Sequence, residues 1–85
     1  MALFLIERNF AEQLEMTKEA AAAVKLVNDE VGVNWLYSFL SADKKKTYCL
    51  YEAVSMAAVR EAARRANIPA DLIIEVSELR PEAFL

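Results

Sequence analysis

The chain has 85 residues, of which 56% are hydrophobic, a length that suits one domain over residues 1–85 with a marginal core. Its formal net charge of −3 argues against a nucleic-acid partner, and no apolar stretch reaches the length that a membrane span needs. The sequence contains no histidine, which excludes Ser-His and Cys-His nucleophile pairs and the commonest transition-metal ligand.

The first half of the chain predicts a strand and a helix. Residues 2–8 form an apolar run with strand character, in which Phe4 and Ile6 share one face. Thr17 is the expected N-cap of a helix that runs to about Val31, and Gly32 supplies the left-handed residue after it. The apolar residues of this helix form one stripe, which consists of Ala20, Val24, Val27 and Val31.

The second half predicts a hairpin, a second helix and a last strand. Residues 33–41 and 47–53 read as strands joined by a charged turn. Ser55 is the expected N-cap of a helix that reaches Ala66, with Asn67 after its end and Pro69 barring continuation. Residues 72–79 read as the last strand, and residues 80–85 as a tail.

The order strand, helix, strand, strand, helix, strand predicts an α+β, ferredoxin-like βαββαβ fold. It has a four-stranded antiparallel sheet with both helices on one face. The other face, called the open face below, would then expose a large apolar patch, so we predict a homodimer or higher homo-oligomer packed through it. Alternation along the strands assigns to the open face Leu3, Leu5, Val33, Trp35, Tyr37, Phe39, Cys49, Tyr51 and Ile73.

Two carboxylates interrupt the apolar strands. Glu7 and Glu75 lie on the first and last strands, which are neighbours in this fold, and both are assigned to the open face. If buried together they would raise each other's pKa and could form an acid/base pair or a hard-cation site. The alternative is that both are hydrated or paired with Arg8 or Arg80.

The aromatic stripe of Trp35, Tyr37 and Tyr51 suits core or dimer packing, or the wall of a pocket. Cys49 is expected to be a small buried hydrophobe, with a soft metal ligand or redox thiol as the alternative. As the sole cysteine it permits no internal disulfide, which fits a reducing compartment, and there is no signal-peptide pattern. We therefore expect a cytoplasmic protein.

Short motifs along nearly the whole chain resemble one family of small bacterial proteins. They are Phe4-x-x-Glu7-Arg8, Trp35-x-x-Ser38-Phe39, Tyr48-Cys49-x-Tyr51-x-Ala53, Ala58-Val59-Arg60-Glu61-x-Ala63, Ile68-Pro69-Ala70 and Glu75-Val76. The family is the domain of unknown function 4242, also described as nickel-binding-protein-like. The resemblance implies a ferredoxin-like fold, a dimer and no established enzymatic activity.

The resemblance also implies nickel binding through histidines and carboxylates, and here the sequence departs from the pattern. Tyr37 and Ala62 occupy the places of two family histidines. Because imidazole suits nickel, a divalent metal is weakly supported and no cofactor is predicted. Five positions still match the family pattern, which leaves room for a pocket of altered chemistry: Glu7, Trp35, Cys49, Glu61 and Glu75.

The sequence as a whole favours a small homodimeric ligand-binding protein whose ligand is unknown. The alternatives are a structural or oligomerisation protein without a ligand site, and a cofactor-free dimeric enzyme, for which the sequence supplies only fold analogy. The partners expected are a second copy and a small molecule, but no nucleic acid or membrane. The candidate ligand-binding residues are Glu7, Trp35, Tyr37, Cys49, Tyr51, Glu61 and Glu75.

Overall fold

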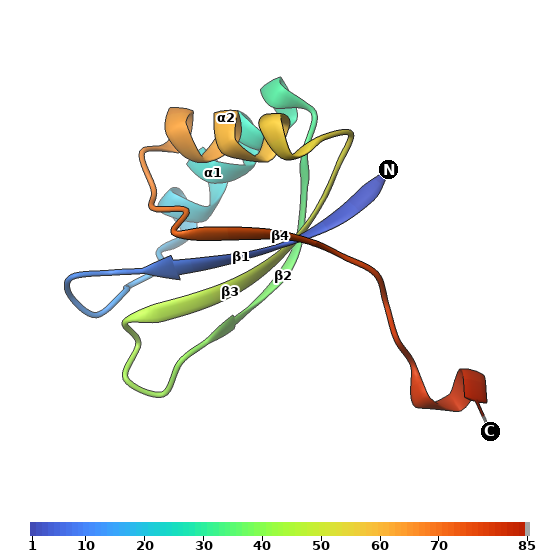
Figure 1. The fold of residues 1–85 in the computed structure, drawn as a ribbon. Coiled ribbons are helices and arrows are strands. Elements are labelled where there is room, and N and C mark those ends of the chain that lie inside the picture. The colour runs from blue at the N-terminus through green and yellow to red at the C-terminus, as the bar shows by residue number, and fades with distance from the viewer. Residues whose placement is uncertain (85) are drawn as a thin grey trace.

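A computed structural model describes residues 1–84 as one four-stranded antiparallel sheet with two helices over one face (Figure 1). The sheet order β2-β3-β1-β4 is that of a ferredoxin-like α+β fold, which confirms the predicted fold class. Within the described residues, no helix is both long and apolar enough to cross a bilayer. In chain order the elements are β1 (Ala2–Asn9), α1 (Lys18–Val31), β2 (Asn34–Leu40), β3 (Lys46–Ala53), α2 (Met56–Ala66), β4 (Leu72–Val76) and the 3-10 helix η1 (Pro81–Phe84).

Both helices begin and end where their capping residues predict. The Thr17 hydroxyl accepts a hydrogen bond from the Ala20 amide at 3.0 Å, and the Ser55 hydroxyl accepts one from the Ala58 amide at 3.1 Å. Each N-cap therefore satisfies one amide that a helix start leaves without a partner. Gly32 ends α1 at φ 84° and Asn67 ends α2 at φ 56°, both in the left-handed region.

The core lies between the sheet and the helices. In β1 the side chains of Phe4 and Ile6 point to this face and are fully buried. Small residues on α2, Ala62 and Ala63, let that helix pack closely on the sheet. The buried apolar residues of this core are Phe4, Ile6, Val33, Cys49, Tyr51, Ala53, Val59 and Ala62.

A β-bulge divides β2 between the two faces of the sheet. Strict alternation predicts Trp35 and Tyr37 on the same face, but the pairing of β2 with β3 shifts register between them. Trp35 lies opposite Tyr51 and packs on the core, whereas Tyr37 lies opposite Leu50 on the open face. The extra residue at the bulge reverses the alternation, so the open-face assignment of Val33 and Trp35 is wrong, while that of Tyr37 and Phe39 is right.

The assignment of three further residues to the open face is also wrong. Cys49 and Ile73 both pair with Ile6, and Tyr51 pairs with Phe4. Directly paired residues on adjacent strands share a face, so all three belong to the helix-covered face. An error of one residue in the alternation assigns every side chain of a strand to the opposite face of the sheet. The predictions for β3 and β4 contained this error.

The last strand is shorter than predicted and ends at Val76. The chain beyond it leaves the body of the domain as an extended arm that ends in η1 (Figure 1). Leu79, in this arm, is 78% exposed. The arm therefore adds little to the core of a single copy.

Candidate functional site

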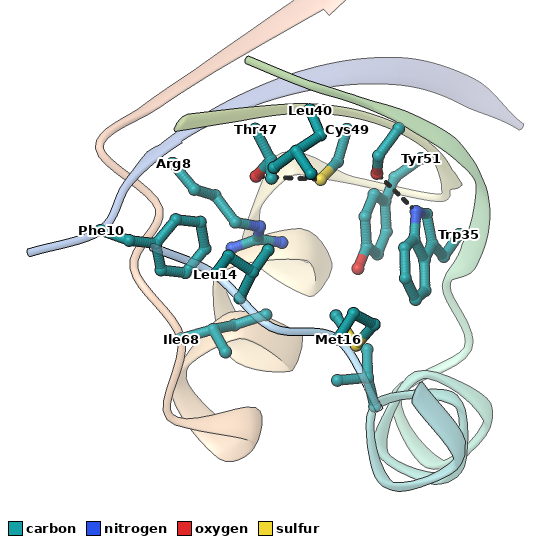
Figure 2. Close-up of a pocket in the computed structure, with 12 residues that line it drawn as sticks. Arg8, Phe10, Leu14, Met16, Trp35, Leu40, Thr47, Cys49, Tyr51 and Ile68 are labelled. Atoms are coloured by element: carbon teal, nitrogen blue, oxygen red, sulfur yellow. Dashed lines mark hydrogen bonds between the residues drawn. The ribbon is translucent and has the colours of Figure 1, made fainter. Parts of the chain in front are cut away.

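A cavity of about 180 Å³ lies on the helix-covered face of the sheet (Figure 2). Its floor comes from β1, β2 and β3, and its roof includes the connection between β1 and α1. Met16 and Leu40, each half exposed, are the most exposed residues of the lining. The lining consists of Arg8, Phe10, Leu14, Met16, Val24, Trp35, Ser38, Leu40, Thr47, Cys49, Tyr51 and Ile68.

Backbone hydrogen bonds hold the roof of the cavity against the β2–β3 hairpin. The Phe10 amide donates to the Lys45 carbonyl at 2.8 Å, and the Leu14 amide donates to the Lys44 carbonyl at 2.7 Å. Lys44 adopts a left-handed conformation, φ 61°, within that hairpin turn. The apolar side chains of the connection can therefore line the cavity although the connection has no regular secondary structure.

Arg8 brings a positive charge into this apolar space. It follows Phe4 and Ile6 on the same face of β1, and it is only 3% exposed. Its Nη1 donates a hydrogen bond to the Pro69 carbonyl, and its guanidinium carbon lies 5.8 Å from the centroid of the Tyr51 ring. The cation–π contact and the hydrogen bond each offset part of the cost of burying the charge.

The chain segment that Arg8 contacts is fixed by further bonds to the end of β1. The Asp71 amide donates to the Glu7 carbonyl at 3.0 Å, and the Asn9 amide donates to the Asp71 carboxylate at 2.7 Å. These bonds anchor the α2–β4 connection, so Pro69 presents its carbonyl to Arg8 from a fixed backbone.

The other polar groups of the cavity come from β2 and β3. The Trp35 indole donates to the Ser38 hydroxyl at 2.8 Å, and the Cys49 thiol donates to the Thr47 hydroxyl at 3.6 Å. Burial raises the pKa of the Tyr51 hydroxyl, and the nearby positive charge of Arg8 partly opposes that shift. A mostly apolar cavity with a few placed polar groups has the make-up of a small-molecule site.

The structure brings together only part of the predicted site. Trp35, Cys49 and Tyr51 line the cavity. Glu7 and Glu75 do not meet, because Glu7 pairs with Leu72 and Glu75 with Phe4, which places the two carboxylates on opposite faces of the sheet. The prediction that both lie on the open face is therefore wrong for Glu75, and the predicted pair of carboxylates is absent from residues 1–84.

The remaining predicted residues lie at the surface and do not line the cavity. Glu7 lies 3.7 Å from the Lys46 ammonium group on the open face. Tyr37 is half exposed on the same face. Glu61 projects from α2, where Arg64 Nη2 donates to its carboxylate at 3.0 Å and this hydrogen bond lowers the pKa of Glu61.

Sequence reasoning missed nine of the twelve lining residues, among them the polar Arg8 and Thr47. The signal for Arg8 was present, since it continues the alternation of Phe4 and Ile6 onto the buried face. Thr47 stands two residues before Cys49 and four before Tyr51, so it shares their face. The lining residues of the β1–α1 connection carry no such signal, because an irregular segment has no period.

The comparisons with known proteins agree with this fold. A family model described as "Nickel responsive protein SCO4226-like" matches residues 4–76, so the chain belongs to this family. The family expected from the short motifs is confirmed at this level, although the matched description does not carry the name domain of unknown function 4242. None of the curated proteins matched the chain.

A solved relative shares both the fold and the length of the chain. The crystal structure of SCO4226 from Streptomyces coelicolor A3(2) superimposes with a TM-score of 0.79 at 25% sequence identity. The match covers 93% of this chain and 100% of that chain. The similarity therefore spans nearly the whole chain.

The donors of this chain do not fit a resident nickel ion. Among residues 1–84, no group of three or more histidine, cysteine, aspartate or glutamate side chains gathers where it could hold a metal. Glu7 and Cys49, two positions that match the family pattern, lie on opposite faces of the sheet. Cys49 lies among apolar side chains, and the sequence lacks histidine, whose imidazole suits nickel.

Proposed function

We propose that the protein is a small cytoplasmic homodimer that binds a small molecule in the cavity beneath the β1–α1 connection. The observation that carries the proposal is the cavity itself, with its apolar lining and its buried Arg8. Its volume of about 180 Å³ exceeds that of a cavity of about 150 Å³ that accommodates benzene in another protein. A ligand of this site is therefore compact and largely apolar.

The open face supports the dimer. Its exposed apolar side chains come from β2 and β4 and flank the half-buried Leu5 of β1. Such a face suits packing against the same face of a second copy, in an isologous interface. Residues on it that are at least 44% exposed are Tyr37, Phe39, Leu72 and Ile74.

The ligand and the second copy would thus use different faces of one sheet. Tyr37, which the sequence offered as a ligand-binding residue, belongs to the dimer face in this proposal. The single free cysteine, Cys49, is buried beside the cavity, which suits a protein that works in a reducing compartment.

A thermal-shift screen with small aromatic and aliphatic compounds tests the ligand site. We expect at least one compound to raise the melting temperature, because a ligand that binds only the native state stabilises it. Val24→Phe fills the cavity from α1 and should abolish the shift, while Val54→Phe, at a 73% exposed position, should preserve it. A screen without hits would instead favour a protein whose only role is oligomerisation.

A further inference from the structure

We infer that the cavity selects a small apolar carboxylate, whose charged group pairs with Arg8 and whose body fills the space between Trp35, Leu14 and Met16. This inference rests on the proposed ligand-binding function and names the chemical class of the ligand. Figure 2 shows the guanidinium of Arg8 projecting into the cavity between the rings of Phe10 and Tyr51.

Arg8 carries a buried positive charge. An arginine is almost never fully buried unless it is paired, yet none of the ion pairs formed by residues 1–84 includes Arg8. Among the lining residues that the structure describes, it alone carries a charge. The buried cation therefore has no anionic partner among residues 1–84.

The geometry of the Arg8 guanidinium suits a carboxylate. It carries five N–H donors in a planar fork, and within residues 1–84 its one side-chain hydrogen bond goes to the Pro69 carbonyl. That bond and the Tyr51 side chain fix the group in place and leave other N–H donors of the fork for a ligand. A fixed fork in a low-dielectric site binds a carboxylate through two parallel hydrogen bonds.

The rest of the cavity lining selects among anions. Apart from Arg8, the polar side chains of the lining are uncharged, and two pairs of them bond to each other: Trp35 with Ser38, and Cys49 with Thr47. A strongly hydrated anion such as inorganic phosphate would lose its water without replacement here. A carboxylate with an apolar body pairs its charge with Arg8 and buries the remainder against apolar side chains.

The test uses matched acids and amides at neutral pH. Benzoate and 3-methylbutanoate are titrated into the dimeric protein alongside benzamide and 3-methylbutanamide, with inorganic phosphate as the hydrated anion. Trp35, the only tryptophan, lines the cavity and reports binding by its fluorescence. We expect at least one acid to bind about tenfold or more tightly than its amide, since hydrogen bonds to a charged group are the stronger ones, and phosphate to give no saturable change.

Two arginine variants test whether Arg8 causes the preference for acids over amides. Arg8→Met removes the charge at similar length and should reduce the affinity for the acid to that for the amide. Arg60→Met makes the same change on the exposed surface of α2 and should bind as the unaltered protein does. If Arg8→Met does not fold, the acid–amide comparison on the unaltered protein decides alone.

The outcomes separate this inference from the proposed function. Equal binding of acids and amides, or an unchanged preference in Arg8→Met, overturns the carboxylate and leaves a ligand cavity. No binding by any acid, with hits of other chemistry in the thermal-shift screen, also overturns the carboxylate alone. No binding by the acids and no hit in the screen overturns both.

Discussion

The two faces of the sheet are similar in composition and different in surroundings. On the helix-covered face, Ile6 is 0% exposed and packs with Cys49 and Ile73 under the helices. On the open face, Ile74 pairs with Leu5, yet it is 44% exposed. Hydrophobic residues on both faces of a strand usually mean that both faces are covered. The contrast teaches that the helices of one copy cover only one of the two apolar faces of the sheet.

The contrast extends to the charged residues. Arg8 is buried on the covered face without a carboxylate partner among residues 1–84, whereas its neighbour Glu7 meets Lys46 in partial contact with solvent on the open face. The covered face therefore holds the unbalanced charge and the cavity. The open face has an apolar surface, and the charges of Glu7 and Lys46 at its edge offset each other. Such a face suits packing against another protein surface.

The largest effect expected concerns the core. Ile6→Ala removes a fully buried side chain and should lower the free energy of unfolding by about 2–5 kcal/mol, whereas Ile74→Ala should cost about 0.5 kcal/mol at concentrations where the protein is monomeric. Urea denaturation monitored by circular dichroism measures both. Equal losses at the two positions would show that a single copy packs both faces alike.

The second effect concerns association. Phe39→Lys places a charge on the open face at a 64% exposed position, and Leu26→Lys makes a similar change at a 62% exposed position on α1. Sedimentation equilibrium should show that Phe39→Lys raises the dimer dissociation constant about a hundredfold or more, while Leu26→Lys leaves it unchanged. The proposed interface would be contradicted if the unaltered protein is a monomer, or if the Phe39→Lys protein dimerises with unchanged affinity.

A smaller effect concerns alkaline pH. Burial raises the pKa of Tyr51, so above about pH 10 the unfolded chain releases the phenolic proton before the native protein does, and stability falls as pH rises. Tyr51→Phe should reduce this loss of stability at alkaline pH. The control Tyr37→Phe, on the open face, should keep the part of the loss that Tyr51 causes. Urea denaturation at a series of pH values provides the comparison. An identical alkaline slope in Tyr51→Phe would mean that this hydroxyl is not the buried group that titrates.

The smallest effect concerns the ion pair on the open face. Glu7→Gln removes the charge that faces Lys46 at 3.7 Å. Because both side chains are partly exposed, the loss of stability should stay within about 1 kcal/mol and shrink as salt is added. A loss that is larger and independent of salt would indicate that Glu7 is desolvated, as at a tight subunit interface.

Much of the fold was predictable because it depends on local signals. Thr17, Gly32, Ser55 and Asn67 mark the helix ends by capping chemistry that acts within a few residues. The faces of the strands were less predictable, since the bulge at β2 leaves no mark in a run where almost every residue is apolar. Where both faces of a strand carry apolar residues, alternation does not show which face is buried. The same ambiguity in β3 allowed Cys49 and Tyr51 to be assigned to either face.

The site was predictable only in part, for a related reason. Trp35, Cys49 and Tyr51 were named, but for a face that they do not occupy. The cavity depends on how the irregular connection between β1 and α1 folds over the sheet, and that depends on backbone bonds to Lys44 and Lys45. Such bonds join any residue types, so side-chain patterns do not predict them.

The most direct test of the division between the two faces is a two-dimensional NMR spectrum of the isotope-labelled protein with and without a set of small aromatic compounds. The account predicts that at least one compound shifts the Trp35 indole and the Thr47 amide in a saturable way, while the amides of Tyr37 and Ile74 stay in place. Shifts confined to the open face, or none with any compound, would contradict it.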